Sequence, residues 1–92
     1  MVDICGRVIG ERGEGVWNAT VVFRPTHTPG ATPKFALSEG DGEFTVADLV
    51  PGNYTVIVTQ RFYAVHSFML DVARDEYIEV SLVPDTGHPR VY

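Results

Sequence analysis

The sequence predicts an all-β domain in which seven short antiparallel strands form two packed sheets. An Asp-Gly turn at residues 41–42 precedes a run of alternating apolar and polar residues, and a Pro-Gly turn at 51–52 precedes a second run. Tight turns of this chemistry beside period-2 alternation are the strongest local signal of paired strands. No stretch repeats apolar residues at helical spacing over three turns, so no substantial helix is expected.

The first two strands are predicted from alternation alone. Residues 2–9 alternate and end at the glycine-rich segment 10–15. Residues 19–23 form the second strand, with their three odd-numbered apolar side chains on one face. The prolines within 25–33 then predict an irregular loop, because proline lacks the N–H group that a β-ladder needs.

Five further strands follow, each bounded by turn residues. They are predicted at residues 34–38, 43–46, 53–60, 64–72 and 77–83. Gly42, Pro51 and Gly52 are assigned to the turns, and Gly52 is expected to need a positive φ. Residues 84–92 fit no strand pattern, so the sequence predicts a sandwich domain over 1–83 and a C-terminal tail over 84–92.

Composition narrows the classes of partner. The 92 residues suffice for one domain, and their net charge of −5 with scattered basic residues argues against a nucleic-acid partner. No run approaches the ~20 apolar residues of a membrane span. Asp3 and Arg7 interrupt the first apolar stretch, so a signal peptide is not expected. We therefore expect a protein made in the cytoplasm, and its single cysteine allows no internal disulfide.

Glycines, aromatic residues and aliphatic residues recur in four patterns: Gly6-x-Val8, Gly15-Val16-x-x-Ala19-x-Val21-x-Phe23, Ser38-x-x-Asp41-Gly42-x-Phe44 and Leu49-x-Pro51-Gly52-x-Tyr54-x-Val56-x-Val58. From residue 4 to residue 82 the chain thereby resembles the carboxypeptidase regulatory-like domain, which belongs with the transthyretin-like and Cna-B-like sandwiches. The resemblance implies an Ig-like or prealbumin-like sandwich that stabilises, spaces or docks larger partners without catalysis. The family's Gly-Tyr pair after the fifth strand is replaced here by residues 60–63.

The sequence predicts no catalytic residue, metal site or cofactor. His27, His66 and His88 have no local partner at ligand spacing, and the acidic turn 39–43 has too few ligands for a calcium loop. The serines have no adjacent base to activate them. Transthyretin-like proteins include a 5-hydroxyisourate hydrolase, but its terminal Tyr-Arg-Gly-Ser motif is not matched by residues 88–92.

The predicted interaction surface lies on the outside of the sandwich. The resemblance turns Ile4, Gly6 and Val8 toward the core, which leaves Cys5 on an outer face where a neighbouring subunit could cover it or cross-link to it. Exposed aromatic and aliphatic groups on a small acidic domain are typical of a protein interface. The candidate interface residues are Cys5, Trp17, Ile57, Arg61, Phe62, Tyr63, Arg90 and Tyr92.

The first functional hypothesis is a structural module that docks onto a larger homo- or hetero-oligomeric assembly through edge strands, loop aromatics and its tail. By analogy it is a virion accessory, such as a phage capsid-decoration or tail protein. The alternative is a carbohydrate-binding or adhesive module, in which Trp17, Phe62 and Tyr63 would stack on a glycan. The remote alternative, the hydrolase, requires the three histidines to converge in one cleft.

Overall fold

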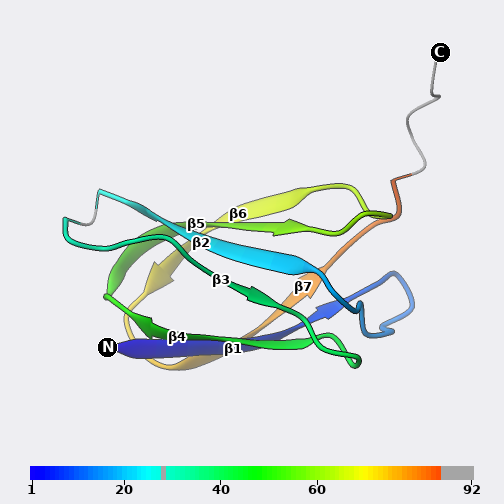
Figure 1. Cartoon of the computed structure of the whole chain (residues 1–92), viewed down its shortest axis with the longest axis horizontal. Coiled ribbons are helices and arrows are strands. Elements are labelled where there is room, and N and C mark those ends of the chain that lie inside the picture. Colours follow the sequence, from blue (N-terminus) through cyan, green and yellow to red (C-terminus); the bar gives the residue numbers. More distant parts are fainter. Residues whose placement is uncertain (28, 86–92) are drawn as a thin grey trace, which may run out of the picture.

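The computed structural model describes residues 1–27 and 29–85, and it is a two-layered sandwich (Figure 1). Seven strands and two sheets confirm the predicted architecture, and the described part of the chain contains no helix. The strands are β1 (Val2–Ile9), β2 (Thr20–Thr26), β3 (Lys34–Leu37), β4 (Glu43–Leu49), β5 (Gly52–Thr59), β6 (His66–Val72) and β7 (Glu76–Ser81).

One sheet has the order β4-β1-β7 and the other has the order β3-β2-β5-β6. The prediction that every pairing is antiparallel is wrong for one pair, because residues 4–9 of β1 and 76–81 of β7 pair in parallel. The last residue of β6 and the first residue of β1 lie at the same end of the sandwich (Figure 1). The short connection 73–75 crosses to the other sheet there, so β7 starts beside the start of β1 and runs parallel to it. The backbone N–H of Asp3 donates to Asp75 Oδ1 at 2.9 Å and ties this connection to β1.

Every strand except β1 begins or ends one to three residues away from its predicted boundary, and β4 extends to Leu49 instead of ending at 46. Two of the other differences have identifiable reasons. β2 continues through Pro25 to Thr26, because β3 pairs with β2 only as far as Phe23 and the rest of β2 has β5 as its single neighbour. Proline is tolerated in such edge segments. β6 begins two residues late, because the backbone N–H of Ala64 donates instead to the carbonyl oxygen of Val83.

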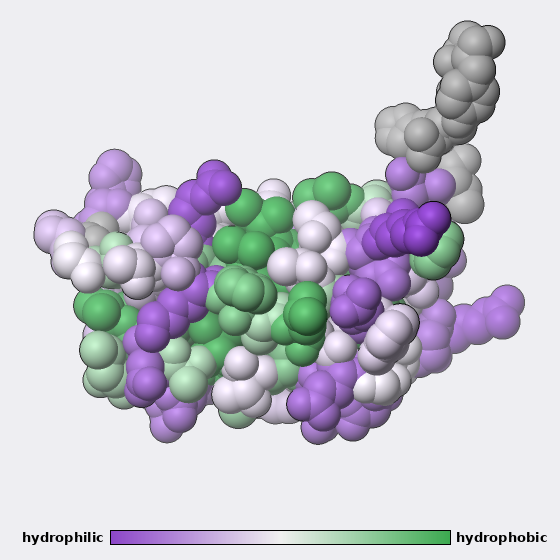
Figure 2. Space-filling view, viewed as in Figure 1, coloured by the Kyte–Doolittle hydropathy of each residue, from purple (hydrophilic) through white to green (hydrophobic). Residues whose placement is uncertain are grey.

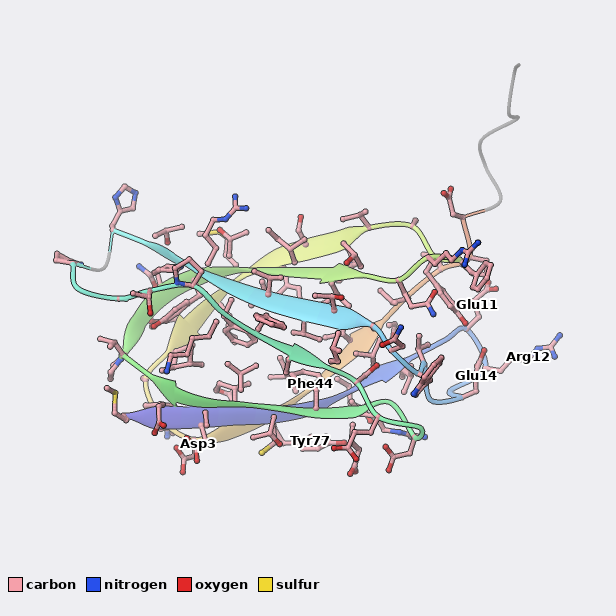
Figure 3. All side chains as sticks on the ribbon, in the orientation of Figure 1. Asp3, Glu11, Arg12, Glu14, Phe44 and Tyr77 are labelled. Atoms are coloured by element: carbon pink, nitrogen blue, oxygen red, sulfur yellow. The ribbon has the colours of Figure 1, made fainter. Side chains whose placement is uncertain are left out.

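The core lies between the sheets and follows the predicted alternation. Ile4, Val8 and Phe23 are fully buried, and Phe44 points between the two sheets in Figure 3. The rings of Phe23 and Tyr54 meet edge to face, with centroids 6.0 Å apart. The buried apolar residues are Val2, Ile4, Val8, Val16, Ala19, Val21, Phe23, Phe44, Val46, Leu49, Tyr54, Val56, Val58, Val72, Val80 and Leu82.

Three of the positive φ values bear on the two predicted turns and on β4. Gly42 has a φ of 87°, and Gly52, the first residue of β5, has a φ of 155°. Asp48 has a φ of 60° and lies where the register between β1 and β4 shifts. Its backbone N–H donates to Asp3 Oδ1 at 3.0 Å, so a carboxylate of β1 holds the bulge of β4 in place.

Tyr54 fixes the connection between β4 and β5. Removing its hydroxyl group should change the free energy of unfolding by an amount that depends on pH. Its hydroxyl donates to the carbonyl oxygen of Val50 at 2.5 Å, and burial raises the pKa of its phenol above the ordinary 10.0. Tyr54→Phe should lower the free energy of unfolding at pH 8 by about 1 kcal/mol, the typical net value of such a bond.

The folded state holds the Tyr54 proton more tightly than the unfolded state does. The stabilisation is therefore complete below pH 10 and is lost as the pH rises through the raised pKa of the folded protein. Urea unfolding of the wild type and of Tyr54→Phe at pH 8 and pH 11 measures this. The gap in stability between the two proteins should narrow at pH 11, and a constant gap would contradict the assignment.

Candidate protein-interaction surface

The described residues form no enclosed site. No pocket is present within residues 1–27 and 29–85, and no three His, Cys, Asp or Glu side chains of that part are placed to hold a metal ion. No helix in it could span a membrane. His27 follows the end of β2 and His66 begins β6, so these two histidines lie at opposite ends of one sheet. His88 lies outside the described residues.

A cluster of exposed apolar side chains lies on the outside of the four-stranded sheet. Phe35 pairs with Val22, and Val22 pairs with Ile57, which places the three side chains in one row. The rows on either side add Leu37 and Met69. We call these five residues the outer apolar face. Phe35, Leu37 and Met69 are 68%, 51% and 65% exposed, and Figure 2 shows hydrophobic side chains gathered over β2 and β3.

The two sheets differ in charge. The strands of the four-stranded sheet carry two basic residues and one acidic residue, a net charge of +1. The strands of the three-stranded sheet carry one basic and five acidic residues, a net charge of −4. Figure 3 shows Asp3 and Tyr77 of the three-stranded sheet pointing away from the core. The acidic residues of these strands are Asp3, Glu43, Asp48, Glu76 and Glu79.

Four of the predicted interface residues lie together at one end of the sandwich. The Gln60 side chain joins them, because its Nε2 donates to the Trp17 carbonyl oxygen at 3.2 Å and its Oε1 accepts from the Phe62 N–H at 2.8 Å. The Arg61 guanidinium lies 5.4 Å from the centroid of the Phe62 ring. Trp17 and Phe62 are 64% and 66% exposed, whereas Tyr63 is half-buried against the core.

The last described residues, 84 and 85, lie at this same aromatic end. The backbone N–H of Asp85 donates to the carbonyl oxygen of Phe62 at 3.1 Å, and Tyr63 forms an isolated β-bridge with Pro84. The first residues of the predicted tail are therefore tied to the loop between β5 and β6. The candidate interface residues Arg90 and Tyr92 lie outside the described residues.

The other two predicted residues lie on opposite faces. Cys5 is exposed on the outside of the three-stranded sheet between Thr45 and Tyr77, and the Thr45 hydroxyl donates to its Sγ at 3.6 Å. Ile57 lies on the outside of the four-stranded sheet, where β2 and β6 flank it. One flat partner surface therefore cannot cover both residues.

Sequence reasoning missed the three most exposed members of the outer apolar face. Phe35 and Leu37 alternate with Ala36, so local periodicity could have placed both on one side of their strand. Met69 alternates in the same way with Phe68 and Leu70. In β3 the alternation favours the wrong side, because Phe35 and Leu37 are larger and more apolar than Lys34 and Ala36 on the other side. In β6, Ser67 and Asp71 share the outer side with Met69, so the alternation of this strand does indicate which side faces water.

Comparison with known proteins places the fold. In solved structures, the chain is similar to a DUF3823 family protein from Parabacteroides merdae ATCC 43184, with 15% identity over 90% of this chain and 46% of that chain and a TM-score of 0.71. It is also similar to a chain of a type II cohesin–X–dockerin complex from Acetivibrio cellulolyticus, with 19% identity, 89% and 57% coverage, and a TM-score of 0.69.

A third similar structure is the Bacillus anthracis TIE protein, with 15% identity, 90% and 16% coverage, and a TM-score of 0.66. The chain thus spans about half the length of the first two solved chains that it matches, and less of the third. A search of curated proteins found no match. The family model described as the carboxypeptidase regulatory-like domain matches residues 3–83. The chain therefore belongs to the carboxypeptidase regulatory-like domain family, as its sequence motifs predicted.

Proposed function

We propose that this domain is a non-catalytic module that docks onto a protein partner through the outer apolar face. The observation that carries the proposal is the exposure of Phe35, Leu37 and Met69 beside Val22 and Ile57 on one sheet. Burying such a side chain fully contributes about 1.5–3 kcal/mol, so a partner that covers this face gains binding energy. Clustered exposed apolar side chains of this kind mark protein contacts.

The sheet geometry suits docking because the face is already rigid. Val22 and Ile57 belong to strands whose alternate residues, Val21, Val56 and Val58, are fully buried in the core. A partner therefore orders few additional backbone atoms when it binds, which keeps the entropic cost of association low. The strands beneath the face carry a net charge of +1, whereas the strands of the other sheet carry −4. A partner with acidic residues around its contact surface would therefore be repelled by the three-stranded sheet but not by this face.

The likeness to a chain of a cohesin–X–dockerin complex supports the proposal only by showing that this fold occurs within a protein complex. Incorporation into a larger oligomeric assembly stays a prediction from the sequence. So does the specific setting of a phage virion, with the chain as a capsid-decoration or tail protein.

The carbohydrate-binding alternative is less well supported by the aromatic end. Trp17 and Phe62 are both exposed there, as sugar stacking would require. Gln60 is the carboxamide that lies between them, and both its nitrogen and its oxygen already bond to the backbone. This carboxamide is therefore committed to holding the loops together, and the docking function accounts better for the exposed surface.

Site-specific cross-linking tests which face docks. Photoreactive benzoylphenylalanine is placed at position 35 in one variant and at position 77 in a matched control, because Phe35 and Tyr77 are both exposed aromatics on opposite sheets. In the native host, the position-35 variant should cross-link to a discrete partner and the position-77 variant should not. Equal cross-linking at both positions, or cross-linking at position 77 alone, would overturn the proposal.

Phe35→Ser should then weaken binding of the cross-linked partner by about 30-fold, the effect of losing roughly 2 kcal/mol at an aromatic anchor. The thermal melting curve should change little, because the Phe35 side chain is 68% exposed in the isolated domain. Isothermal titration calorimetry with the purified partner measures the affinity. Tyr77→Ser is the control, and its affinity should match that of the wild type.

A further inference from the structure

The four edge strands of the sandwich are not equally protected against pairing with another strand. β3 has only four residues and begins with Lys34 after Pro33. β4 contains the bulge at Asp48, and β7 carries Glu76 and Glu79. Short length, lysine, proline, bulges and charges are the features by which natural sheets block unwanted pairing at an edge.

β6 has none of these protections along most of its length. It contains seven residues, and it pairs with β5 in unbroken register from Val72 opposite Gly52 to His66 opposite Val58. Its single acidic residue, Asp71, is the second-to-last residue of the strand. β3 and β4 are edge strands that contact each other on one side of the sandwich, so the edge strands β6 and β7 lie on the other side. Within the described sheets, β6 has β5 as its single hydrogen-bonded neighbour.

The side chains of β6 also remain incompletely covered. Phe68 and Leu70 point toward the core but are only half-buried, whereas their cross-strand partners Val56 and Tyr54 are fully buried. On the outer side, Met69 is 65% exposed. The free edge of β6 therefore combines backbone groups that no strand of the described sheets pairs with, half-buried apolar side chains on the core side, and the exposed Met69 on the outer side.

We infer that a second copy of this chain pairs with β6 in an antiparallel arrangement centred on Met69, which joins the two four-stranded sheets into one. Met69 is the middle residue of the strand, so centring the two-fold axis there pairs all seven residues. On the core side, Phe68 then faces Leu70 of the second copy. On the outer side, Met69 faces its own symmetry mate.

Charge supports this register. The antiparallel arrangement places Asp71 opposite Ser67 of the second copy, so a carboxylate meets a hydroxyl group that can donate a hydrogen bond to it. No two like charges stand opposite each other along the strand, because His66 faces Val72. Shifting the centre to Leu70 would instead place Asp71 against the thioether of Met69, which offers the carboxylate no donor.

The size of the docking surface gives a second argument, which rests on the proposed function. Four strands about 4.8 Å apart and seven residues about 3.3 Å apart make a face on the order of 450 Å². A specific interface needs about 800 Å² on each partner. Met69 belongs to the edge strand β6, so pairing through β6 brings the outer apolar faces of two copies together along this edge. The two faces then have a combined area of about 900 Å².

Charge variants at Ser67 test the pairing by sedimentation velocity over a range of protein concentrations. The wild type should form a dimer. Ser67→Asp should raise the dissociation constant of the dimer about tenfold, because it places two carboxylates opposite each other at two symmetric positions. Ser67→Lys should lower the constant, and Ser67→Asp combined with Asp71→Lys should restore it toward the wild-type value. Ser67 and Asp71 are exposed, so thermal melting should show that all variants fold.

Ser81→Asp is the matched control, because Ser81 is an exposed serine on the edge strand β7 of the other sheet. It should leave the dissociation constant unchanged. A wild type that stays monomeric at every concentration would overturn the inference, and so would a dimer that is indifferent to Ser67→Asp. Both measurements use the isolated chain, so either failure would leave the cross-linking test of docking at position 35 unaffected.

Discussion

Replacing Gly42 by alanine is expected to lower the free energy of unfolding by about 2–5 kcal/mol. The φ of 87° at Gly42 is a conformation that costs residues with a Cβ about 1–2 kcal/mol. The new Cβ would also overlap the Val8 carbonyl oxygen and lie 3.0 Å from the Val16 nitrogen. These are backbone atoms that cannot rotate away, and such overpacking adds about 1–3 kcal/mol.

Three segments would be disturbed at once. The Val8 N–H donates to the Gly42 carbonyl oxygen at 2.8 Å, the Val16 N–H donates to that of Val8 at 2.8 Å, and the Gly42 N–H donates to that of Glu39 at 2.8 Å. Gly42 therefore lies where β1, the loop before β2 and the turn before β4 meet.

Gly13→Ala provides a matched control for this substitution. Gly13 has a φ of 78°, but a Cβ added there would find no atom within 4 Å. Only the conformational cost of about 1–2 kcal/mol should remain. Urea unfolding monitored by circular dichroism measures both variants. Equal losses of stability would show that backbone conformation alone, and not the contact with Val8 and Val16, makes glycine necessary at position 42.

Ser38→Ala is expected to lower the free energy of unfolding by about 2–6 kcal/mol. Ser38 is 3% exposed, and its hydroxyl both donates to the Val16 carbonyl oxygen at 2.6 Å and accepts from the Ala19 N–H at 2.8 Å. Alanine would leave both backbone groups without this partner in a buried environment, and each such loss costs about 1–3 kcal/mol.

The Ser38 variant has a local readout as well as a global one. Trp17 is the single tryptophan of the sequence and lies between the two backbone groups that Ser38 holds. Its fluorescence should change in Ser38→Ala before the global unfolding transition. Ser81→Ala, at an exposed serine, should stay within about 0.5 kcal/mol of the wild type. A Ser38 variant as stable as this control would contradict the buried role.

These substitutions also give a physical meaning to the Ser38-x-x-Asp41-Gly42-x-Phe44 pattern. Ser38 clamps the loop before β2, and Asp41 Oδ1 accepts from the Glu43 N–H at 3.0 Å within the turn. Gly42 allows the close approach of β1. Phe44 fills the core above Gly6, where a Cβ would strike its ring. The pattern is therefore a folding signal, which explains why it predicts the family well and the partner poorly.

Local sequence determined the approximate positions of the strands and, for β1, β2, β5 and β7, the face that turns inward. The Asp-Gly and Pro-Gly turns and the alternation at Tyr54, Val56 and Val58 correctly predicted which side chains are buried, and they left Ile57 on the outer side. They succeeded because turn chemistry and period-2 burial act between residues that are close in the chain.

The tertiary structure alone decided which strands are neighbours. The parallel pairing of β1 with β7 depends on where β6 ends in space. The outer apolar face gathers Phe35, Ile57 and Met69 from three different strands, and the acidic residues gather on the other sheet. A short strand such as β3, in which Phe35 and Leu37 face outward and Ala36 packs against the core, acquires its inside and outside only when hydrogen bonding to a distant segment places it in a sheet, and local periodicity does not encode that pairing.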